Sequence, residues 1–229
     1  MLYQILHKAE ANDLIIKNPV RFADKLKKTD TESRKDSFTR EEVALLMSNL
    51  PKDKMGHTIR LMIGTGLRVQ EVVCLTKDTI EEDGSIIRVR SAVQMVKGKV
   101  ILDEGHTKTF KSKRDIPVPE FVRESAIFLR EQADPFIWSG IIPNTVYSVK
   151  SFRNRYTACI AKIEGVRPLT PHCCRHTYVT LLQSLNISLE VIAGLTGHTD
   201  IKTTKEYLHI QPETARLVSD AYSKALAEL

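Results

Sequence analysis

The sequence predicts a mainly α-helical domain that contains a small three-stranded antiparallel β-sheet, an α+β fold. Apolar residues recur at helical spacing along most of the chain after Ser37. Between positions 85 and 118 this spacing changes to the alternation that is typical of strands. A polar and charged stretch at 25–35 separates the domain from a short apolar segment at the N-terminus.

The N-terminal residues 1–18 are predicted to form one helix, because their apolar side chains approximate a helical stripe. Asn18-Pro19 is a typical stop signal for it. A lone helix cannot bury its own stripe, so we expect it to pack on the next domain or to belong to a domain upstream. The chain is therefore expected to be a fragment. The predicted boundaries are 1–24 for this segment, 25–36 for a linker and 37–229 for the main domain.

The first helix of the main domain has a well-marked start. Thr39 is a suitable N-cap, and Glu42, three residues later, completes a capping box ahead of an apolar run. A second helix is predicted over about 55–63, where the glycines that follow end it. A third helix begins at about Arg68.

The strands are predicted at 85–96, 99–104 and 114–118. The first two flank a Lys-Gly dipeptide and should form a hairpin. After Pro119 the helical pattern returns and continues to the end of the chain. The sheet is thus an insertion in a helical domain.

The composition indicates which class of partner the protein binds and in which cellular compartment it acts. The net charge of +6 on 229 residues favours an acidic partner such as nucleic acid, although solubility alone would also account for it. The four cysteines include no CxxC pair and form no disulfide framework, which fits buried thiols in a reducing cytoplasm. No apolar run reaches the length of a membrane span, and the N-terminus lacks the layout of a signal peptide.

The segment 171–177, PHCCRHT, concentrates two histidines, two cysteines and an arginine at the predicted start of a helix. Thr170 is a good N-cap, and Pro171 suits the first helical position. Helical spacing places Cys174 on the core face, where it acts as a small apolar side chain. The predicted core face consists of Cys174, Tyr178, Leu181, Leu182 and Leu185.

His172, Arg175 and His176 lie on a different face, and the pattern argues against a metal site. The adjacent cysteines point in different directions, and an arginine between the ligands would repel a cation. A phosphate fits better, because a helix N-terminus offers free N–H groups and Arg175 adds a planar pair of donors. An ordinary surface histidine remains the alternative for either histidine alone. We expect no metal and no other cofactor.

Three further segments carry residues that suit phosphate chemistry. GTGLRVQEV places Arg68 at a helix start, and GHTKTFKSKRDIPV places Lys108 between two strands. GLTGHTDIKTTKEYLHI places His198 after one helix and Tyr207 on the next. Each has a plainer interpretation when taken alone: a surface arginine, a basic turn residue or a packing aromatic.

Together, the four segments resemble the catalytic domain of the tyrosine recombinases, the family of phage and conjugative-element integrases. The matching motifs are TGLRxxE at 65–71, TKTxKSKRxIPV at 107–118, HxxRHT at 172–177 and GHxxIxTTxxYxH at 197–209. Their order and spacing also agree with the family, and the resemblance covers about 37–229. It implies that 1–24 is the last helix of a core-DNA-binding domain whose remainder is absent.

The resemblance implies the role of each site residue. The implied catalytic residues are Arg68, Lys108, His172, Arg175, His198 and Tyr207. Tyr207 would attack the scissile phosphate to form a 3′-phosphotyrosyl link, and Lys108 would protonate the leaving 5′-oxygen. Glu71 and His176 are expected to support the site without reacting. The arginines would replace a metal ion, so that neither metal nor ATP is required.

The motif at 107–118 contains three lysines, and two positions elsewhere depart from the family pattern. The family uses the lysine nearest the start of this turn, which favours Lys108 over Lys111 and Lys113. Cys174 and Thr196 stand where leucine is commoner, and neither belongs to the reactive set.

The resemblance also implies partners. The expected partner is double-stranded DNA that carries recombination sites, bound by a tetramer of the protein with accessory DNA-bending proteins. The expected setting is the bacterial cytoplasm, at the nucleoid, with integration or excision of a mobile element as the role. The amphipathic tail after Tyr207 would dock either on its own domain or on a neighbouring protomer.

Two other function classes compete with this hypothesis. A type IB topoisomerase uses the same chemistry on a single duplex, and an inactive relative would merely bind DNA. The lysine turn and the GHxxIxTT segment favour the recombinase over the topoisomerase. An inactive relative would have lost reactive residues, and the sequence retains all of them.

Overall fold

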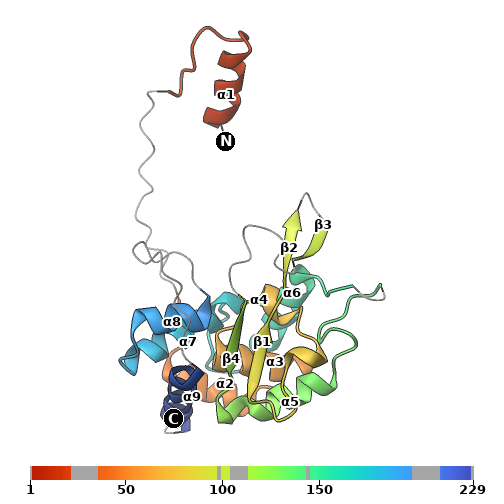
Figure 1. Cartoon of the computed structure of the whole chain (residues 1–229), viewed down its shortest axis with the longest axis vertical. Coiled ribbons are helices and arrows are strands. Elements are labelled where there is room, and N and C mark those ends of the chain that lie inside the picture. The colour runs from red at the N-terminus through yellow and green to blue at the C-terminus, as the bar shows by residue number, and fades with distance from the viewer. Residues whose placement is uncertain are drawn as a thin grey trace. The chain divides into compact units, whose positions relative to one another are not determined.

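A computed structural model describes residues 2–21, 36–96, 99–103, 113–142, 145–197 and 212–227. The α-helices (Figure 1) are α1 Leu2–Ala11, α2 Arg40–Asn49, α3 Lys54–Thr65, α4 Val69–Val72, α5 Arg123–Glu131, α6 Val149–Ile160, α7 Pro171–Ser184, α8 Leu189–Thr196 and α9 Pro212–Ala227. The strands and 3-10 helices are β1 Ile86–Val89, β2 Ala92–Val96, β3 Lys99–Asp103, β4 Arg114–Pro117, η1 Lys77–Thr79 and η2 Glu120–Val122. The chain divides into two compact units, 1–34 and 35–229.

The first unit contains α1, which is shorter than the helix predicted over 1–18. Two polar residues beyond Ala11 stop it. The Asn12 side chain donates to the carbonyl oxygen of Lys8 (2.8 Å), and Asp13 adopts a φ of 54°. Asn and Asp tolerate such left-handed backbone and make these local hydrogen bonds, so they end helices that an apolar stripe alone would prolong. The predicted linker at 25–35 lies outside the described residues.

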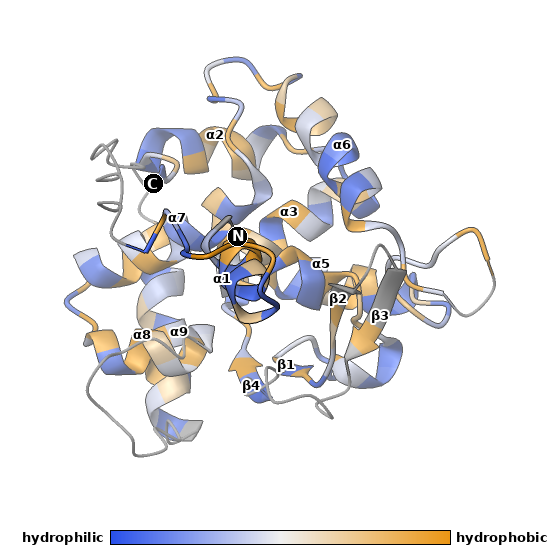
Figure 2. Cartoon of the chain, turned by 90° about the horizontal axis from the view of Figure 1, so that it is seen from above, coloured by the Kyte–Doolittle hydropathy of each residue, from blue (hydrophilic) through white to orange (hydrophobic). Residues whose placement is uncertain are grey.

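The second unit is built around α3, with α5, α6 and α7 packed around it (Figure 2). Side chains on all sides of α3 are buried, and Ile59, Leu61, Met62 and Ile63 are fully enclosed. A helix whose side chains are buried in every direction lies in the middle of a core. Helices predominate among the described elements of this unit, so the mainly helical character predicted from the sequence is confirmed. None of the described helices is both long and apolar enough to span a membrane.

The capping box predicted at the start of α2 is present. Thr39 Oγ1 accepts a hydrogen bond from the Glu42 N–H (3.2 Å), and Glu42 Oε2 accepts one from the Thr39 N–H (2.8 Å). The same carboxylate pairs with Arg167 (2.8 Å), and this contact chiefly holds the pKa of Glu42 at about 2. The ion pair thus connects the start of the domain to Arg167, which lies far along the chain.

The small antiparallel β-structure differs in detail from the prediction. The strand predicted over 85–96 is interrupted at Arg90 and Ser91; β1 pairs with β4, and β2 pairs with β3. The predicted small antiparallel β-structure is therefore present, but the described strands form two two-stranded ladders, so its three-stranded detail is confirmed only in part. The Arg90 side chain donates to the carbonyl oxygen of Arg114 (3.1 Å) at the end of the β1–β4 ladder. The chain from β3 to β4 is also much longer than that from β1 to β2, so one register cannot run through both ladders.

The end of α3 depends on Gly66. The predicted glycine break is confirmed there, but Gly64 remains inside the helix, which runs on to Thr65. Gly66 is the C-cap, with a φ of 65°. A Cβ atom at this position would lie 2.5 Å from Cδ1 of Tyr178 on α7, so a side chain is excluded on steric grounds as well.

We expect Gly66→Ala to lower the free energy of unfolding by roughly 1–3 kcal/mol, from backbone strain and from the clash with Tyr178. Urea denaturation of the two proteins measures this difference. Gly165→Ala is the matched control, because Gly165 also has a positive φ (80°) but faces only a methyl carbon of Leu45 at 3.1 Å. Equal losses in both variants would show that the contact with α7 contributes nothing.

The C-terminal helix α9 packs on η2, β4 and α7 of its own unit. The apolar side predicted for this tail consists of Ala215, Val218, Tyr222 and Ala225; the first three are buried and Ala225 is partly buried. The Tyr222 hydroxyl donates to the carbonyl oxygen of Ile63 in α3 (3.1 Å). This contact places α9 against the helix that leads into Gly66.

Candidate active site

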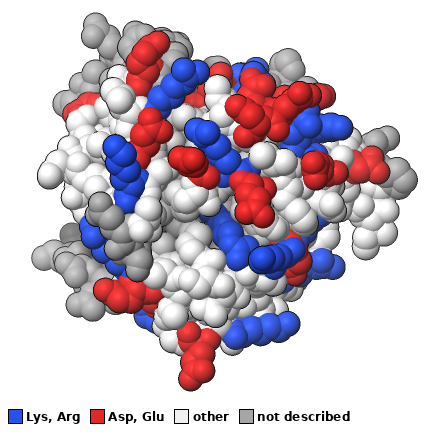
Figure 3. All heavy atoms as spheres, turned by 90° about the horizontal axis from the view of Figure 1, so that it is seen from below, with Lys and Arg blue, Asp and Glu red and all other residues white. Residues whose placement is uncertain are grey.

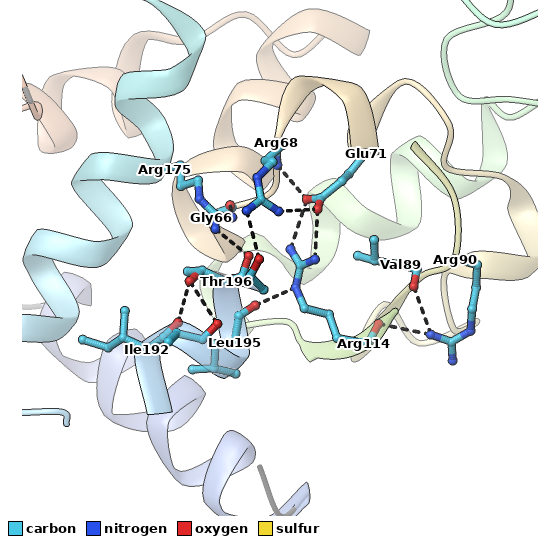
Figure 4. A network of polar contacts seen from close by, with 12 residues as sticks. Gly66, Arg68, Glu71, Val89, Arg90, Arg114, Arg175, Ile192, Leu195 and Thr196 are labelled. Atoms are coloured by element: carbon cyan, nitrogen blue, oxygen red, sulfur yellow. Dashed lines mark hydrogen bonds and ion pairs between the residues drawn. The ribbon is translucent and has the colours of Figure 1, made fainter. Parts of the chain in front are cut away.

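Three arginine side chains converge on the C-terminal end of α8 (Figure 4). They come from α7, from β4 and from the residue before α4. Arg114, Arg175 and Arg68 donate to three consecutive carbonyl oxygens, those of Leu195, Thr196 and Gly197, at 2.7, 2.5 and 3.0 Å. The last carbonyls of a helix lack partners within the helix and carry partial negative charge, so guanidinium groups suit them. The end of α8 thereby organises the cluster.

Arg68 and Glu71 form the local half of this arrangement. Glu71 lies in the first turn of α4, where its Oε2 accepts from the Arg68 N–H (2.9 Å) and its Oε1 accepts from Arg68 Nη1 (2.9 Å). The Arg68 side chain keeps 28% of its surface exposed. A ligand can therefore reach this cation while Glu71 holds it.

Arg114 is a member of the cluster that the sequence interpretation missed. Its Nη1 and Nη2 donate to the two oxygens of Glu71, at 2.9 and 3.0 Å. A signal for it exists in the sequence: Arg114 and Ile116 share one face of β4, and Ile116 is fully buried, whereas Asp115 on the other face is exposed. An arginine on the core face of a strand requires a buried partner, and Glu71 is that partner.

The Glu71 carboxylate is buried, with 2% of its side chain exposed. Burial raises its pKa, but Arg114 and then Arg68 outweigh this effect and hold the pKa at about 2. Because this value lies below that of an unfolded glutamate, the ion pairs stabilise the fold at neutral pH. Their contribution disappears only as the pH falls from the ordinary glutamate range towards 2. The cluster is thus fully charged at neutral pH.

Arg175 is almost entirely buried, at 1% exposure, and does not lie on an exposed helix face with His172. Its Nη1 donates to the carbonyl oxygen of Gly66 (2.8 Å), and its Nε has no hydrogen-bond partner in the described structure. Burial, followed by the nearby Arg68, lowers the pKa of Arg175 to about 9, which leaves it a cation at neutral pH. A buried guanidinium that contacts carbonyl groups and no carboxylate retains its attraction for an anion.

His172 and His176 lie one helical turn apart on α7, with ring centroids 4.5 Å apart and ring planes at 86°. His172 is exposed. Desolvation of the ring lowers its pKa, and electrostatic repulsion from the neighbouring His176, Arg175 and Arg68 lowers it further. The neutral imidazole is therefore the dominant form at pH 7, and it can donate one hydrogen bond beside the arginines.

The two departures from the recombinase motif pattern are accommodated by packing. Cys174 is fully buried and its Sγ lies 3.3 Å from the Tyr156 hydroxyl, which confirms its predicted place on the core face. Thr196 is also buried, and its hydroxyl donates back to the carbonyl oxygen of Ile192 (2.6 Å). Among the described residues, no three His, Cys, Asp or Glu side chains are grouped closely enough to hold a metal ion.

The structure brings together Arg68, Glu71, His172, Arg175 and His176 from the predicted site. Lys108, His198 and Tyr207 lie outside the described residues. The catalytic roles assigned to all of these residues therefore stay predictions. His198 follows Gly197 directly in the sequence, and the carbonyl of Gly197 is the one that Arg68 contacts.

A cluster of arginines around one buried carboxylate, in a mainly helical domain, has the donor groups that suit a phosphate or a similar anion. Residues 36–214 match the sequence model of the phage integrase family. The chain belongs to this family and contains a tyrosine recombinase catalytic domain.

Individual proteins agree with this assignment. Tyrosine recombinase XerA of Pyrococcus furiosus is 28% identical over 202 residues, which are 82% of this chain and 61% of that protein. XerA of Thermococcus onnurineus is 30% identical over 203 residues, covering 82% and 65%. The chain therefore spans less than two thirds of the length of these relatives. The Tn1549 transposon integrase, solved with circular intermediate DNA, has a similar fold, with a TM-score of 0.68 and 22% identity over 94% of this chain and 74% of that one.

Proposed function

We propose that this protein cuts and rejoins DNA strands at specific sites, and that it integrates or excises a mobile element. The observation that carries the proposal is Arg175, a buried cation that contacts two backbone carbonyls and no carboxylate in the described structure. Its unpartnered Nε–H would find an acceptor in an anion bound at the site. Membership of the phage integrase family makes a DNA phosphodiester the natural anion.

The proposed reaction is a transesterification. The Tyr207 oxygen forms a bond to phosphorus, and the bond from phosphorus to the 5′-oxygen breaks, which leaves a 3′-phosphotyrosyl link. A free tyrosine hydroxyl titrates near pH ~10, so a histidine or water must accept its proton. Lys108 supplies a proton to the leaving 5′-oxygen. Attack by a 5′-hydroxyl on the phosphotyrosyl bond reverses these steps and rejoins the strand.

Stabilisation of the transition state falls to the arginines and histidines. Negative charge increases on the non-bridging phosphate oxygens as the tyrosine attacks. Arg68 and Arg175 would neutralise this charge, and His172 and His198 would donate further hydrogen bonds. Because burial excludes water around Arg175, its interaction with the phosphate is stronger than it would be in solution. No metal and no other cofactor enters this mechanism.

The proposed partner is double-stranded DNA carrying recombination sites, bound by a tetramer of the protein with accessory DNA-bending proteins. The net charge of +6 supports a polyanionic partner. Acidic and basic side chains alternate on the face shown in Figure 3, so the positive charge is not gathered there. In the proposed arrangement, 1–24 ends a core-DNA-binding domain, 25–36 links it to the catalytic domain at 37–229, and the protein acts in the bacterial cytoplasm.

A covalent-adduct assay tests the proposed function. The chain is incubated in EDTA with nicked duplexes that tile the DNA beside its own gene, and the products are separated on an SDS gel. We expect a protein–DNA adduct, because cleavage beside a nick loses the short strand and traps the phosphotyrosyl link. The same assay on the whole protein, with any sequence upstream of Met1 included, is the positive control. Absence of an adduct in both, or an adduct that requires a divalent metal, would overturn the proposal.

A further inference from the structure

The role of Arg114 is defined by its position between two parts of the site. We propose that Arg114 is a positioning residue for strand cleavage, which fixes Glu71 and the C-terminal end of α8 in the arrangement that presents Arg68 and Arg175 to the phosphate. This inference rests on the proposed function. It adds a residue from β4 to a site otherwise drawn from the residue before α4, from α7 and from the segments around 108 and 198–207.

The contact of Arg114 with Glu71 has the geometry of a strong ion pair. Both guanidinium Nη atoms donate to the two carboxylate oxygens, at 2.9 and 3.0 Å. The side chains are 9% and 2% exposed, so water competes little with this bidentate contact. The Nε and both Nη atoms of Arg114 donate within the protein, whereas Arg175 Nε has no partner in the described structure, so Arg114 is a poor candidate for direct contact with a DNA backbone. Its effect on the reaction is therefore exerted through its neighbours.

Glu71 transmits the position of Arg114 to Arg68. Its Oε1 accepts from both guanidinium groups, each at 2.9 Å, so the carboxylate is shared. Without Arg114, Glu71 would be a buried carboxylate with Arg68 as its remaining guanidinium partner. It would then either pair more closely with Arg68 and draw this side chain away from the phosphate, or take up a proton and no longer hold Arg68 in place. Both outcomes disturb the cation that a ligand can reach.

The other side of the same guanidinium holds the end of α8. Arg114 Nε donates to the carbonyl oxygen of Leu195 (2.7 Å), and the next two carbonyls accept from Arg175 and Arg68. One planar group thus binds both the carboxylate and the helix end, and it sets the distance between them. Lysine carries the same charge but has a single nitrogen, so it cannot keep both contacts in this geometry.

The test compares Arg114→Ala and Arg114→Lys with the unaltered chain, using the nicked duplex that gives an adduct. Single-turnover cleavage is measured at saturating DNA, from mildly acidic to neutral pH. We expect Arg114→Ala to cleave roughly 10–100-fold more slowly, as is usual when a group that orients reactive residues is lost. DNA affinity should change less than about threefold, because phosphate contacts at the surface supply it. Arg114→Lys should restore part of the rate.

The pH profile separates positioning from simple stabilisation. Arg114 keeps the pKa of Glu71 low, so its removal should raise that pKa. As the pH is lowered, the cleavage rate of the variant should then begin to decline at a higher pH than that of the unaltered chain. Adding Glu71→Gln to Arg114→Ala should abolish this shift. Arg88→Ala is the matched control, since Arg88 lies on β1 in the same ladder and pairs with Glu81 at the surface. It should leave the rate and the profile unchanged.

The outcomes distinguish this inference from the proposed function. No adduct from the unaltered chain on any duplex, nor from the whole protein, contradicts the proposed function itself. An adduct from the unaltered chain, with the same rate and pH profile in Arg114→Ala, overturns the positioning role alone. A slower rate that only follows the unfolded fraction measured by circular dichroism, with no shift of the profile, assigns Arg114 to stability and also overturns it.

Discussion

Tyr207→Phe is expected to abolish the covalent protein–DNA adduct on a nicked duplex. Phenylalanine lacks the oxygen that would bond to phosphorus, so no phosphotyrosyl link can form at this position. The ring itself is retained, and DNA affinity should stay within about twofold because phosphate contacts dominate it. SDS gels and an equilibrium binding assay on the same duplex measure the two quantities separately.

Tyr222→Phe is the matched control for the loss of a tyrosine hydroxyl. The Tyr222 hydroxyl is buried and donates to the carbonyl oxygen of Ile63, so its removal should cost about 1 kcal/mol of stability. Adduct formation should remain, provided that the assay is run well below the unfolding transition. If Tyr207→Phe still formed the adduct, peptide mapping of the linked residue would identify another nucleophile and the assignment of Tyr207 would fail.

Features set by neighbouring residues were predictable from the sequence. The capping box of Thr39 and Glu42 and the turn at Gly66 both depend on positions a few residues apart. Hydrogen-bond geometry and backbone conformation at such spacing depend little on the rest of the fold. The face of α7 that carries Cys174 also followed from helical spacing alone.

Features set by distant partners were not predictable in the same way. The burial of the Arg175 side chain depends on Gly66 and on the end of α8, which lie far from it in the sequence. Helical spacing correctly separated Arg175 from the core stripe of α7, but it could not show that another helix end covers that side. The two-ladder β-structure likewise depends on chain length outside the strands, which alternation does not reveal.

Arg114 illustrates how a buried polar contact escapes a search by motif. The segment RDIPV is predicted to be a strand, and the resemblance to the family assigns chemistry to a nearby lysine and no role to this arginine. The alternation of the strand, with Ile116 buried and Asp115 exposed, points the arginine inward. A buried arginine needs an acceptor, and the search for one leads to Glu71.

Arg175→Ala should reduce single-turnover strand cleavage by roughly 10³-fold, because it removes a buried cation from the site of developing negative charge. DNA affinity should fall less than about threefold, since a side chain that is 1% exposed contributes little to surface phosphate contacts. Burial of an incompletely paired charge is itself unfavourable, so its removal partly offsets the lost hydrogen bonds to Gly66 and Thr196. Rate and affinity are measured on the same nicked duplex.

Arg60→Ala is the matched control, because Arg60 also donates to backbone carbonyls at the end of a helix. Its guanidinium contacts the carbonyl oxygens of Leu50 and Pro51, at 2.5 and 3.0 Å, beside the end of α2. That variant should lose stability and keep its cleavage rate at a temperature where it is folded. If Arg175→Ala instead lost affinity and cleavage in equal proportion, Arg175 would bind DNA without acting on the transition state. If it lost only stability, as Arg60→Ala should, its contacts with Gly66 and Thr196 would be structural.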